Sequence, residues 1–183
     1  MNFLENYYNN YDEEGRLLRR HGQVEYLTTM HYINNILQQD KSKRILEVGA
    51  GTGRYSVTLA KEGYEVDAVE LVQHNLDILK SKLDGSEKIT PVQGNALDLS
   101  RYGDGEFDLV LLLGPMYHLY TKDMKVEREK IIAADGATVY MRDKVNEFDD
   151  ETFDLWMKYH LAICERMDLI GATNHSLDIL KKI

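Results

Sequence analysis

The stretch ILEVGAGTGRYSVTLAKEGYEVDAVE, residues 45–70, places three glycines between two apolar runs and ends on a glutamate. Its pattern predicts a strand, a helix and a second strand, over residues 44–48, 55–61 and 64–70. A strand, a glycine-rich turn and the start of a helix form a site where backbone N–H groups face a ligand's negative groups. Gly49, Gly51 and Gly53 permit the positive φ angles that such a loop needs. The stretch therefore predicts a binding loop for a nucleotide-like cofactor.

The alternation of strands and helices continues beyond this loop. The pattern predicts a helix, a strand and a further strand, over residues 72–83, 88–94 and 107–113. Strands that alternate with helices imply a parallel sheet with right-handed crossovers. We therefore predict an α/β fold, a Rossmann-like parallel sheet with helices on both faces.

The regions on either side of this core give less decisive patterns. Residues 15–39 largely follow helical spacing, as one helix or as a pair broken at Gly22. Residues 125–144 fit either a helix followed by a strand or a hairpin that turns at Asp135-Gly136, because Asp-Gly suits a type I′ turn. Periodicity alone does not separate these alternatives.

The C-terminal region is predicted to be helical. A long helix begins at Asp149 or Asp150, either of which is a good N-cap, and ends at Gly171. The side chains that this helix directs toward the core are Phe153, Met157, Leu161, Cys164 and Met167. Asn174 is predicted to cap a last helix that runs through Leu180.

Length and composition favour one ordinary globular domain. The chain has 183 residues, of which 43% are hydrophobic and 29% charged. This length suits a single domain, residues 1–183, with N-terminal lid helices at 1–40, a cofactor-binding half at 41–120 and a shortened C-terminal half at 121–183. No apolar run approaches the length that spans a bilayer, so we expect no membrane partner.

Charge and cysteine content narrow the partners further. The net charge of −9 repels phosphate backbones, which disfavours a nucleic-acid substrate. The single cysteine, Cys164, builds neither a disulfide framework nor a zinc site, and its apolar helical setting favours a buried thiol. The first fifteen residues lack the basic and apolar segments of a secretory signal, so we expect a cytoplasmic protein. We also expect no bound metal.

Two acids beside the glycine loop indicate which cofactor it binds. A dinucleotide fingerprint reads G-x-G-x-x-G, but here Arg54 stands at the sixth position. Glu47, just before the loop, would repel a pyrophosphate and attract an ammonium and a sulfonium. Glu70, at the end of the second predicted strand, can accept hydrogen bonds from both hydroxyls of a ribose. S-adenosyl-L-methionine meets both conditions.

The same residues resemble a known family. EVGAGTG followed by AVE is similar to motifs I and II of class I S-adenosyl-L-methionine-dependent methyltransferases. QGNALDL at 93–99 and FDLVLLLGPMYHL at 107–119 resemble the next two motifs in order. The N-terminal YYNNYDEEGRLLRR and the C-terminal CERMDLIGATNHSLDILKK resemble the ends of a group of small bacterial methyltransferases that act on small molecules.

The resemblance implies a role for each matching residue. Gly49, Ala50 and Gly51 would line the methionine and ribose, with Gly53 completing the loop. Glu70 would bind the ribose hydroxyls. The remaining positions are Leu71, Asn95 and Ala96 around the adenine, and Leu113 and Gly114 beneath the sulfonium. Independently of the resemblance, Tyr11, with Tyr7 and Tyr8, either closes over the cofactor by cation–π attraction to the sulfonium or packs an N-terminal arm. Asn95 replaces the aspartate that is usual in the family, but its amide oxygen still accepts a hydrogen bond.

The acceptor side of the site is less well defined. Methyl transfer is an in-line displacement in which positioning supplies much of the rate. His118 is the best-placed candidate base, and Tyr117 of the Gly-Pro-Met-Tyr stretch is the second candidate catalytic residue. That stretch lacks the amide of the Asn-Pro-Pro-Tyr motif, which disfavours a DNA base or a protein glutamine as acceptor.

One block of the resembling proteins has no counterpart here. Residues 121–148 are too few for two β-α units, because one βαβ crossover takes about thirty residues. A natural deletion, an engineered or wrongly assembled gene, and a sheet completed by a partner chain all explain this. An uncovered strand invites edge pairing, so we predict a homodimer, with domain swapping as one route to it.

The sequence therefore predicts a methyltransferase that uses S-adenosyl-L-methionine and a small-molecule acceptor. The alternative is a catalytically impaired, cofactor-binding or structural protein that has lost part of the acceptor site. A third hypothesis, an NAD-dependent oxidoreductase, is disfavoured by the glycine spacing and by Glu47.

Overall fold

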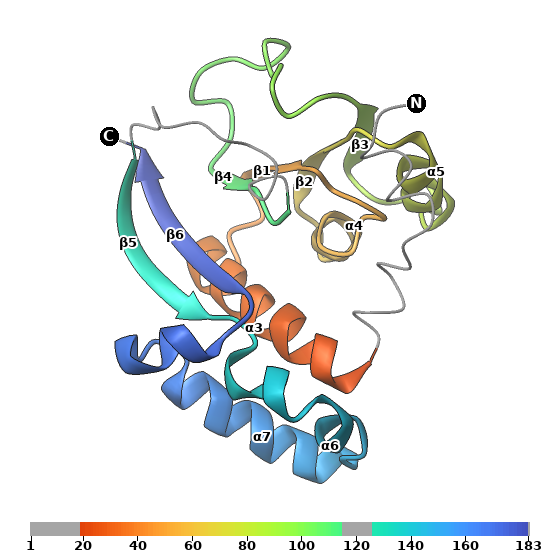
Figure 1. Cartoon of the computed structure of the whole chain (residues 1–183). Coiled ribbons are helices and arrows are strands. Elements are labelled where there is room, and N and C mark those ends of the chain that lie inside the picture. The colour runs from red at the N-terminus through yellow and green to blue at the C-terminus, as the bar shows by residue number, and fades with distance from the viewer. Residues whose placement is uncertain (1–18, 115–125, 183) are drawn as a thin grey trace. The chain divides into compact units, whose positions relative to one another are not determined.

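The computed structural model describes residues 19–114 and 126–182 (Figure 1). Contacts between these residues divide them into two units. The first unit holds the described residues from Leu37 to Gly114, and the second holds residues 19–36 together with residues 126–182. The division of residues 1–183 into lid, cofactor half and shortened half stays a prediction.

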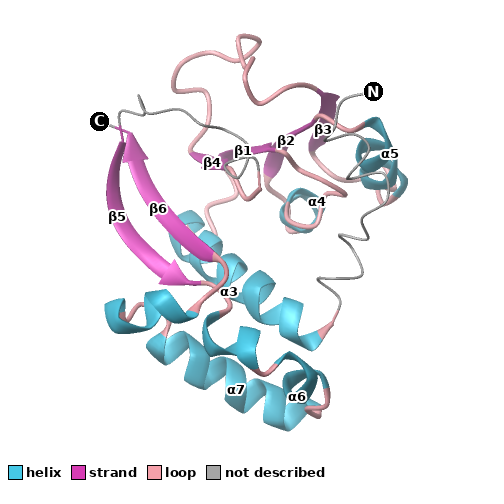
Figure 2. Ribbon diagram, viewed as in Figure 1, coloured by secondary structure: helices cyan, strands magenta, loops and turns pink. Residues whose placement is uncertain are grey.

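The first unit is a parallel sheet with helices in its crossovers (Figure 2). Its strands lie in the order β3-β2-β1-β4, and every neighbouring pair is parallel. In chain order the elements are β1 (Arg44–Val48), α4 (Ser56–Lys61), β2 (Glu65–Glu70), α5 (Gln73–Ser81), β3 (Ile89–Gln93) and β4 (Leu109–Leu111). The predicted Rossmann-like α/β fold class is confirmed. The predicted helices on both faces are not seen among the described residues of this unit, where α4 and α5 pack on one face and residues between β3 and β4 pack on the other.

Side chains of this unit pack against both faces of the sheet. Strand β1 is buried along nearly its whole length, as expected of a central strand in a parallel sheet. On the face of Ala68, α4 and α5 contribute Val57 and Leu79 to one core cluster. On the opposite face, Val69 belongs to a second cluster, which includes Leu46, Val48, Leu99, Tyr102 and Phe107. The carboxyl ends of β1 and β2, which carry the glycine loop and Glu70, are therefore held by packing from both sides.

The second unit joins helices to an antiparallel strand pair (Figure 2). Strand β5 pairs with β6, with a register shift between Arg128 and Lys130. The elements are α3 (Arg20–Leu37), β5 (Val126–Ala133), the 3₁₀ helix η2 (Gly136–Tyr140), α6 (Arg142–Asn146), α7 (Asp150–Ile163), the 3₁₀ helix η3 (Met167–Ala172) and β6 (Ser176–Lys182). Two core clusters fill it, one of Val24, Val145, Phe153 and Met157, the other of Tyr32, Ile132 and Cys164.

The two predicted long helices are present, with one end misplaced. Helix α3 is a single helix, because Gly22 lies inside it without a break. Helix α7 begins as predicted, since the Asp149 carboxylate caps it by accepting a hydrogen bond from Thr152 N at 2.8 Å. It ends at Ile163 and not at Gly171, because the chain turns there. Met167 therefore leaves the predicted core face, and 70% of its surface is exposed.

Two predictions for the C-terminal half are wrong. Neither alternative for residues 125–144 holds, because β5 comes first and pairs with β6, while Asp135-Gly136 leads into η2. The last segment is the strand β6, not a helix. Leu177 and Ile179 alternate along it and pack beside Ile132, so the period-two signal of a strand prevails over the capping signal at Asn174.

Two features are absent from the described part of the chain. None of its helices is long and apolar enough to cross a bilayer. Nor does it contain a group of three or more histidine, cysteine, aspartate or glutamate side chains arranged to hold a metal ion.

Candidate functional site

The glycine loop is tied to the end of β2 by its own N–H groups. Gly49 N and Ala50 N both donate to Val69 O, at 2.8 and 3.0 Å. Gly51 N donates to Glu70 Oε2 at 2.7 Å, and Gly53 N donates back to Ala50 O at 2.9 Å. The prediction that loop N–H groups face a ligand's negative groups is therefore wrong for these four donors. The loop is a poor cradle for a phosphate, because its donors are already used.

Two glycines of the loop serve different purposes. Gly51 has a φ of +55°, and a Cβ built on it would meet nothing within 4 Å among the described residues. Gly53 has a φ of +82°, and its Cβ would lie 2.6 Å from Leu79 Cγ and 2.9 Å from Val57 Cγ2. Gly53 therefore lets the loop pack on α4 and α5, whereas Gly51 borders open space that a ligand can enter.

Glu47 is buried directly beneath this loop. It lies in β1, its residue is 2% exposed, and its Oε2 accepts a hydrogen bond from Ser56 N at 2.9 Å. Burial raises the pKa of Glu47 to about 8, and the nearby Glu70 carboxylate acts in the same direction. The hydrogen bond from Ser56 opposes this rise without cancelling it. At neutral pH Glu47 is therefore mostly protonated, and it is not the fixed negative charge that the sequence predicted.

Glu70 ends β2 and accepts three hydrogen bonds. Gly51 N donates to its Oε2, while Val72 N at 2.8 Å and Asn75 Nδ2 at 3.4 Å donate to its Oε1. A carboxylate offers about four acceptor positions, so one position remains for a ligand hydroxyl without displacing any of these donors. The long contact from Asn75 is the one that a second hydroxyl would replace. Sequence reasoning missed Asn75, because only the turn after β2 brings it back to Glu70.

The other predicted cofactor residues follow the carboxyl ends of neighbouring strands. Leu71 follows β2, Asn95 and Ala96 follow β3, and Leu113 and Gly114 follow β4. Because all four strands are parallel, these positions share one edge of the sheet with the glycine loop. The Asn95 Oδ1 accepts a hydrogen bond from Leu97 N at 3.0 Å, which holds the turn after β3.

Some predicted residues have no described position. Tyr11, Tyr117 and His118 lie outside the described residues, so their roles stay predictions. The cofactor side of the predicted site is thus described, while both candidate catalytic side chains are not.

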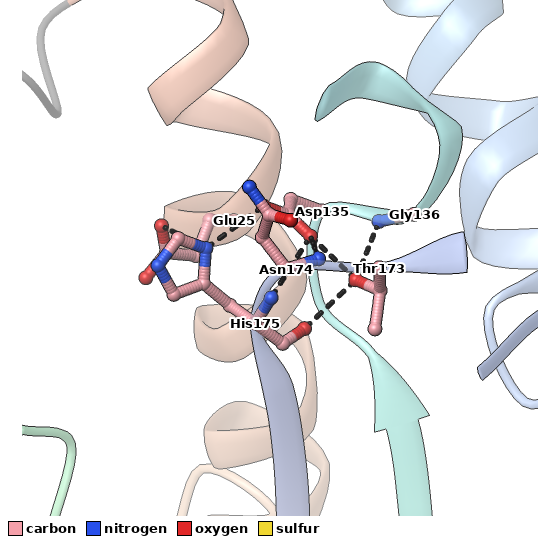
Figure 3. Close-up of polar contacts among 6 residues, drawn as sticks. All are labelled: Glu25, Asp135, Gly136, Thr173, Asn174 and His175. Carbon is pink, nitrogen blue, oxygen red and sulfur yellow. Dashed lines mark hydrogen bonds and ion pairs between the residues drawn. The ribbon is translucent and has the colours of Figure 1, made fainter. Parts of the chain in front are cut away.

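A second polar cluster lies within the second unit (Figure 3). The Asp135 carboxylate accepts hydrogen bonds from Thr173 Oγ1, from Asn174 N at 3.0 Å and from His175 N at 3.2 Å, and its Oδ2 lies 2.8 Å from His175 Nδ1. Glu25 of α3 approaches the same ring nitrogen at 3.5 Å. Burial alone would raise the pKa of Asp135, but hydrogen bonds from His175 and Thr173 outweigh it, so the pKa is lowered.

This cluster fastens three elements of the second unit. It joins α3, the end of β5 and the start of β6, and no sequence pattern connects Asp135 with residues forty positions later. We therefore interpret it as structural. His175, which sequence analysis did not select, takes part through its contacts with two carboxylates.

Comparisons with known proteins identify the sequence around the glycine loop. Residues 45–132 match the family described as a methyltransferase domain. The Bacillus subtilis (strain 168) protein named "Putative methyltransferase YqeM" is 30% identical over 119 residues, which are 60% of this chain and 48% of that protein. The norajmaline N-methyltransferase of Rauvolfia serpentina is 32% identical over 103 residues, 54% of this chain and 35% of that protein.

One solved structure is similar to this chain over a shorter region. The CcbJ methyltransferase from Streptomyces caelestis is 35% identical, with a TM-score of 0.34, over 37% of this chain and 28% of that chain. The chain spans about half the length of the first curated relatives, 48% and 56% of their residues.

The burial of Glu47 makes the stability of the fold depend on pH. Unfolded Glu47 loses its proton near its ordinary pKa of 4.5, whereas folded Glu47 keeps it to about pH 8. Its favourable contribution is therefore complete below pH 4.5 and is lost as pH rises to about 8. Glu47→Gln keeps the acceptor for Ser56 N and removes the titration. We expect this variant to be more stable than wild type by at least about 2 kcal/mol at pH 8 and by nothing measurable at pH 4. Urea unfolding at both pH values measures the difference, and an equal difference at both would contradict it.

The Asp135 cluster should respond to pH in the opposite direction. Because its folded pKa is lowered, Asp135 stabilises the fold above its ordinary pKa of 3.8, and this stability is lost as pH falls through the folded pKa. We expect Asp135→Asn to lower the free energy of unfolding by about 2 kcal/mol at pH 7 and by less below pH 4. The matched control is Asp168→Asn, an exposed partner of Arg166, which should change stability by less than about 0.5 kcal/mol. Equal losses in the two variants at pH 7 would show that the cluster is unimportant.

Proposed function

We propose that this chain, whose residues 45–132 match the family described as a methyltransferase domain, is a class I S-adenosyl-L-methionine-dependent methyltransferase that transfers a methyl group from that donor to a small molecule. The observation that carries the proposal is the open space beside Gly51, next to Glu70 at the carboxyl edge of a parallel sheet. Because the chain spans about half the length of its first relatives, the activity of the whole protein is part of the proposal.

The loop's own hydrogen bonds favour this donor over a dinucleotide. A pyrophosphate needs several N–H donors aimed at it, and those of Gly49, Ala50, Gly51 and Gly53 are bound within the protein. A methionine chain and a ribose need close approach to the backbone instead, which Gly51 permits. This argument supports the methyl donor and counts against the NAD-dependent alternative.

We assign the donor's parts to the residues along this edge of the sheet. Gly49, Ala50 and Gly51 would line the methionine and ribose, and Glu70 would accept a ribose hydroxyl at its remaining position. The further positions are Leu71, Asn95 and Ala96 for the adenine, Leu113 and Gly114 for the sulfonium, and Tyr11 as a cover. When bound, S-adenosyl-L-methionine supplies an activated methyl group, and these residues hold and orient it.

The acceptor is proposed to be a small molecule. Two relatives are named as N-methyltransferases of norajmaline and ajmaline, and the net charge of −9 disfavours a nucleic acid. His118 would take a proton from an acceptor that retains one, and Tyr117 would help to position it. Residence in the cytoplasm stays a prediction from the sequence.

A direct test of the donor site compares two glycines that both have positive φ. Gly51 and Gly63 both have positive φ and open space at the Cβ position, but Gly63 lies in the turn between α4 and β2. Gly51→Ala and Gly63→Ala should each destabilise the fold by about 1 kcal/mol, because alanine is strained in this conformation. We expect only Gly51→Ala to weaken binding of S-adenosyl-L-methionine, by about tenfold or more, in isothermal titration calorimetry.

The outcomes separate the competing functions. Equal affinity of the two variants for S-adenosyl-L-methionine would contradict the assignment of the glycine loop to the donor site. Binding of the donor with no methyl transfer across a broad panel of small amines, phenols and thiols would favour the alternative, a cofactor-binding protein without a working acceptor site.

We also propose that the protein is a homodimer, paired along β4 or by domain swapping. Among the described strands of its sheet, β4 stands at the end of the order and pairs with β1 alone, and 46% of the surface of Val110 is exposed. Size-exclusion chromatography with light scattering at micromolar concentration should give the mass of two chains. A stable single chain under these conditions would count against the proposal.

A further inference from the structure

We propose that Glu47 is a specificity-determining residue that favours the cationic methyl donor over its neutral-sulfur product, because Glu47 releases its proton when the donor binds. This inference rests on the proposed function, since it assumes that S-adenosyl-L-methionine occupies the space beside the glycine loop. Under this inference Glu47 discriminates between the donor and the product. A permanently charged Glu47 would attract both ligands.

The geometry makes Glu47 an acid that lacks a counter-ion. Its residue is 2% exposed, and its carboxyl group accepts a hydrogen bond from the backbone N–H of Ser56. Among the described residues, no lysine, arginine or histidine forms an ion pair with it. A buried carboxylate without a cation is strongly disfavoured, so the group takes up a proton instead.

Of the charged groups near Glu47, only Glu70 shifts its pKa, and it does so in the same direction as burial. Glu70, on the neighbouring strand β2, adds a repulsion that raises the pKa of Glu47. On the loop side, the Lys82 ammonium donates to Thr52 O at 2.9 Å. Arg54, the remaining charged side chain of the loop, carries no contribution to the shift at Glu47. Among the described residues, no positive charge therefore lowers the pKa of Glu47.

The donor supplies the missing positive charge. S-adenosyl-L-methionine carries a sulfonium and an ammonium, whereas S-adenosylhomocysteine carries only the ammonium. Glu47 of β1 is paired with Leu111 of β4, two residues before Leu113, to which the sulfonium is assigned. A cation bound there would stabilise the charged form of the buried carboxyl group, so the O–H bond of Glu47 would break and the proton would pass to solvent. No other bond changes, and the charge of the bound pair stays balanced. Once the methyl group is transferred, the sulfonium charge is gone and Glu47 takes a proton back.

This linkage fixes the direction of the pH dependence. Because binding releases a proton from a group with a pKa of about 8, affinity for the donor rises with pH up to that value and is flat above it. The rise cannot exceed tenfold per pH unit for one proton. Affinity for the product should rise less, so the ratio of the two affinities grows between pH 6 and pH 8.

The test is isothermal titration calorimetry of wild type and Glu47→Gln with both ligands at pH 6, 7 and 8. Each titration is run in two buffers of different ionisation enthalpy, which counts the protons released. For wild type at pH 7 we expect more proton release with S-adenosyl-L-methionine than with S-adenosylhomocysteine, by most of one proton. We expect the affinity ratio to grow about tenfold from pH 6 to pH 8. In Glu47→Gln both differences should disappear.

Two controls remove other sources of protons. Glu47→Gln retains every other titrating group, including the amino groups of the two ligands, so the difference from wild type belongs to Glu47. Glu65→Gln, at the amino end of β2 where Glu65 pairs with Arg44 at 2.9 Å, should behave as wild type. If Glu47→Gln failed to fold, the amino groups of the two ligands would be titrated without protein, and the wild-type proton release corrected for them would still decide the matter.

The outcomes distinguish this inference from the proposed function. If wild type binds neither ligand at any pH, the proposed function fails and takes this inference with it. If both ligands bind but wild type and Glu47→Gln have parallel pH profiles, the inference alone fails. If Glu47→Gln gains no stability over wild type at pH 8, Glu47 is already ionised in the free protein, and the inference is overturned without any ligand.

Discussion

The site of the first unit depends on the attachment of the glycine loop to the end of β2. Val69 O accepts two N–H groups of the loop and Glu70 accepts a third, so three successive residues are fixed by one strand end. These bonds are possible only because β1 and β2 are adjacent and parallel, with Val48 paired to Val69. The register of the sheet thus determines the shape of the loop, and the shape of the loop determines what can approach it.

The same attachment explains why the two acids differ. Glu70 receives donors from Gly51, Val72 and Asn75. Glu47 receives one backbone donor, from Ser56, and lies deeper in the unit. The two acids lie near the carboxyl ends of neighbouring strands, but their surroundings differ. Glu70 accepts hydrogen bonds from three protein donors, whereas Glu47 is mainly desolvated.

Sequence reasoning succeeded where the local residue pattern and the contacts of that segment in the folded protein favour the same element. The bounds of β1, the Asp149 cap of α7 and the parallel order all follow from apolar runs, capping residues and alternation. It failed where a distant segment decides the outcome. Asp135-Gly136 looks like a tight turn, but residues 173–175 donate to the Asp135 carboxylate and β5 takes β6 as its partner. A long-range contact of that kind leaves no periodic trace in the sequence.

The site residues divide along the same line. The glycines and Glu70 were recognisable because their chemistry and their spacing act together within one β-α-β unit. The protonation of Glu47 was not recognisable, because a sequence gives the type of a residue and does not show how far the folded protein shields that residue from water. Sequence reasoning treated Glu47 as a charge that attracts a cation, and this is correct only for an acid that remains ionised before the cation arrives. A protonated acid spares the ligand-free loop the repulsion of two buried charges, and at neutral pH a positive partner favours its charged form.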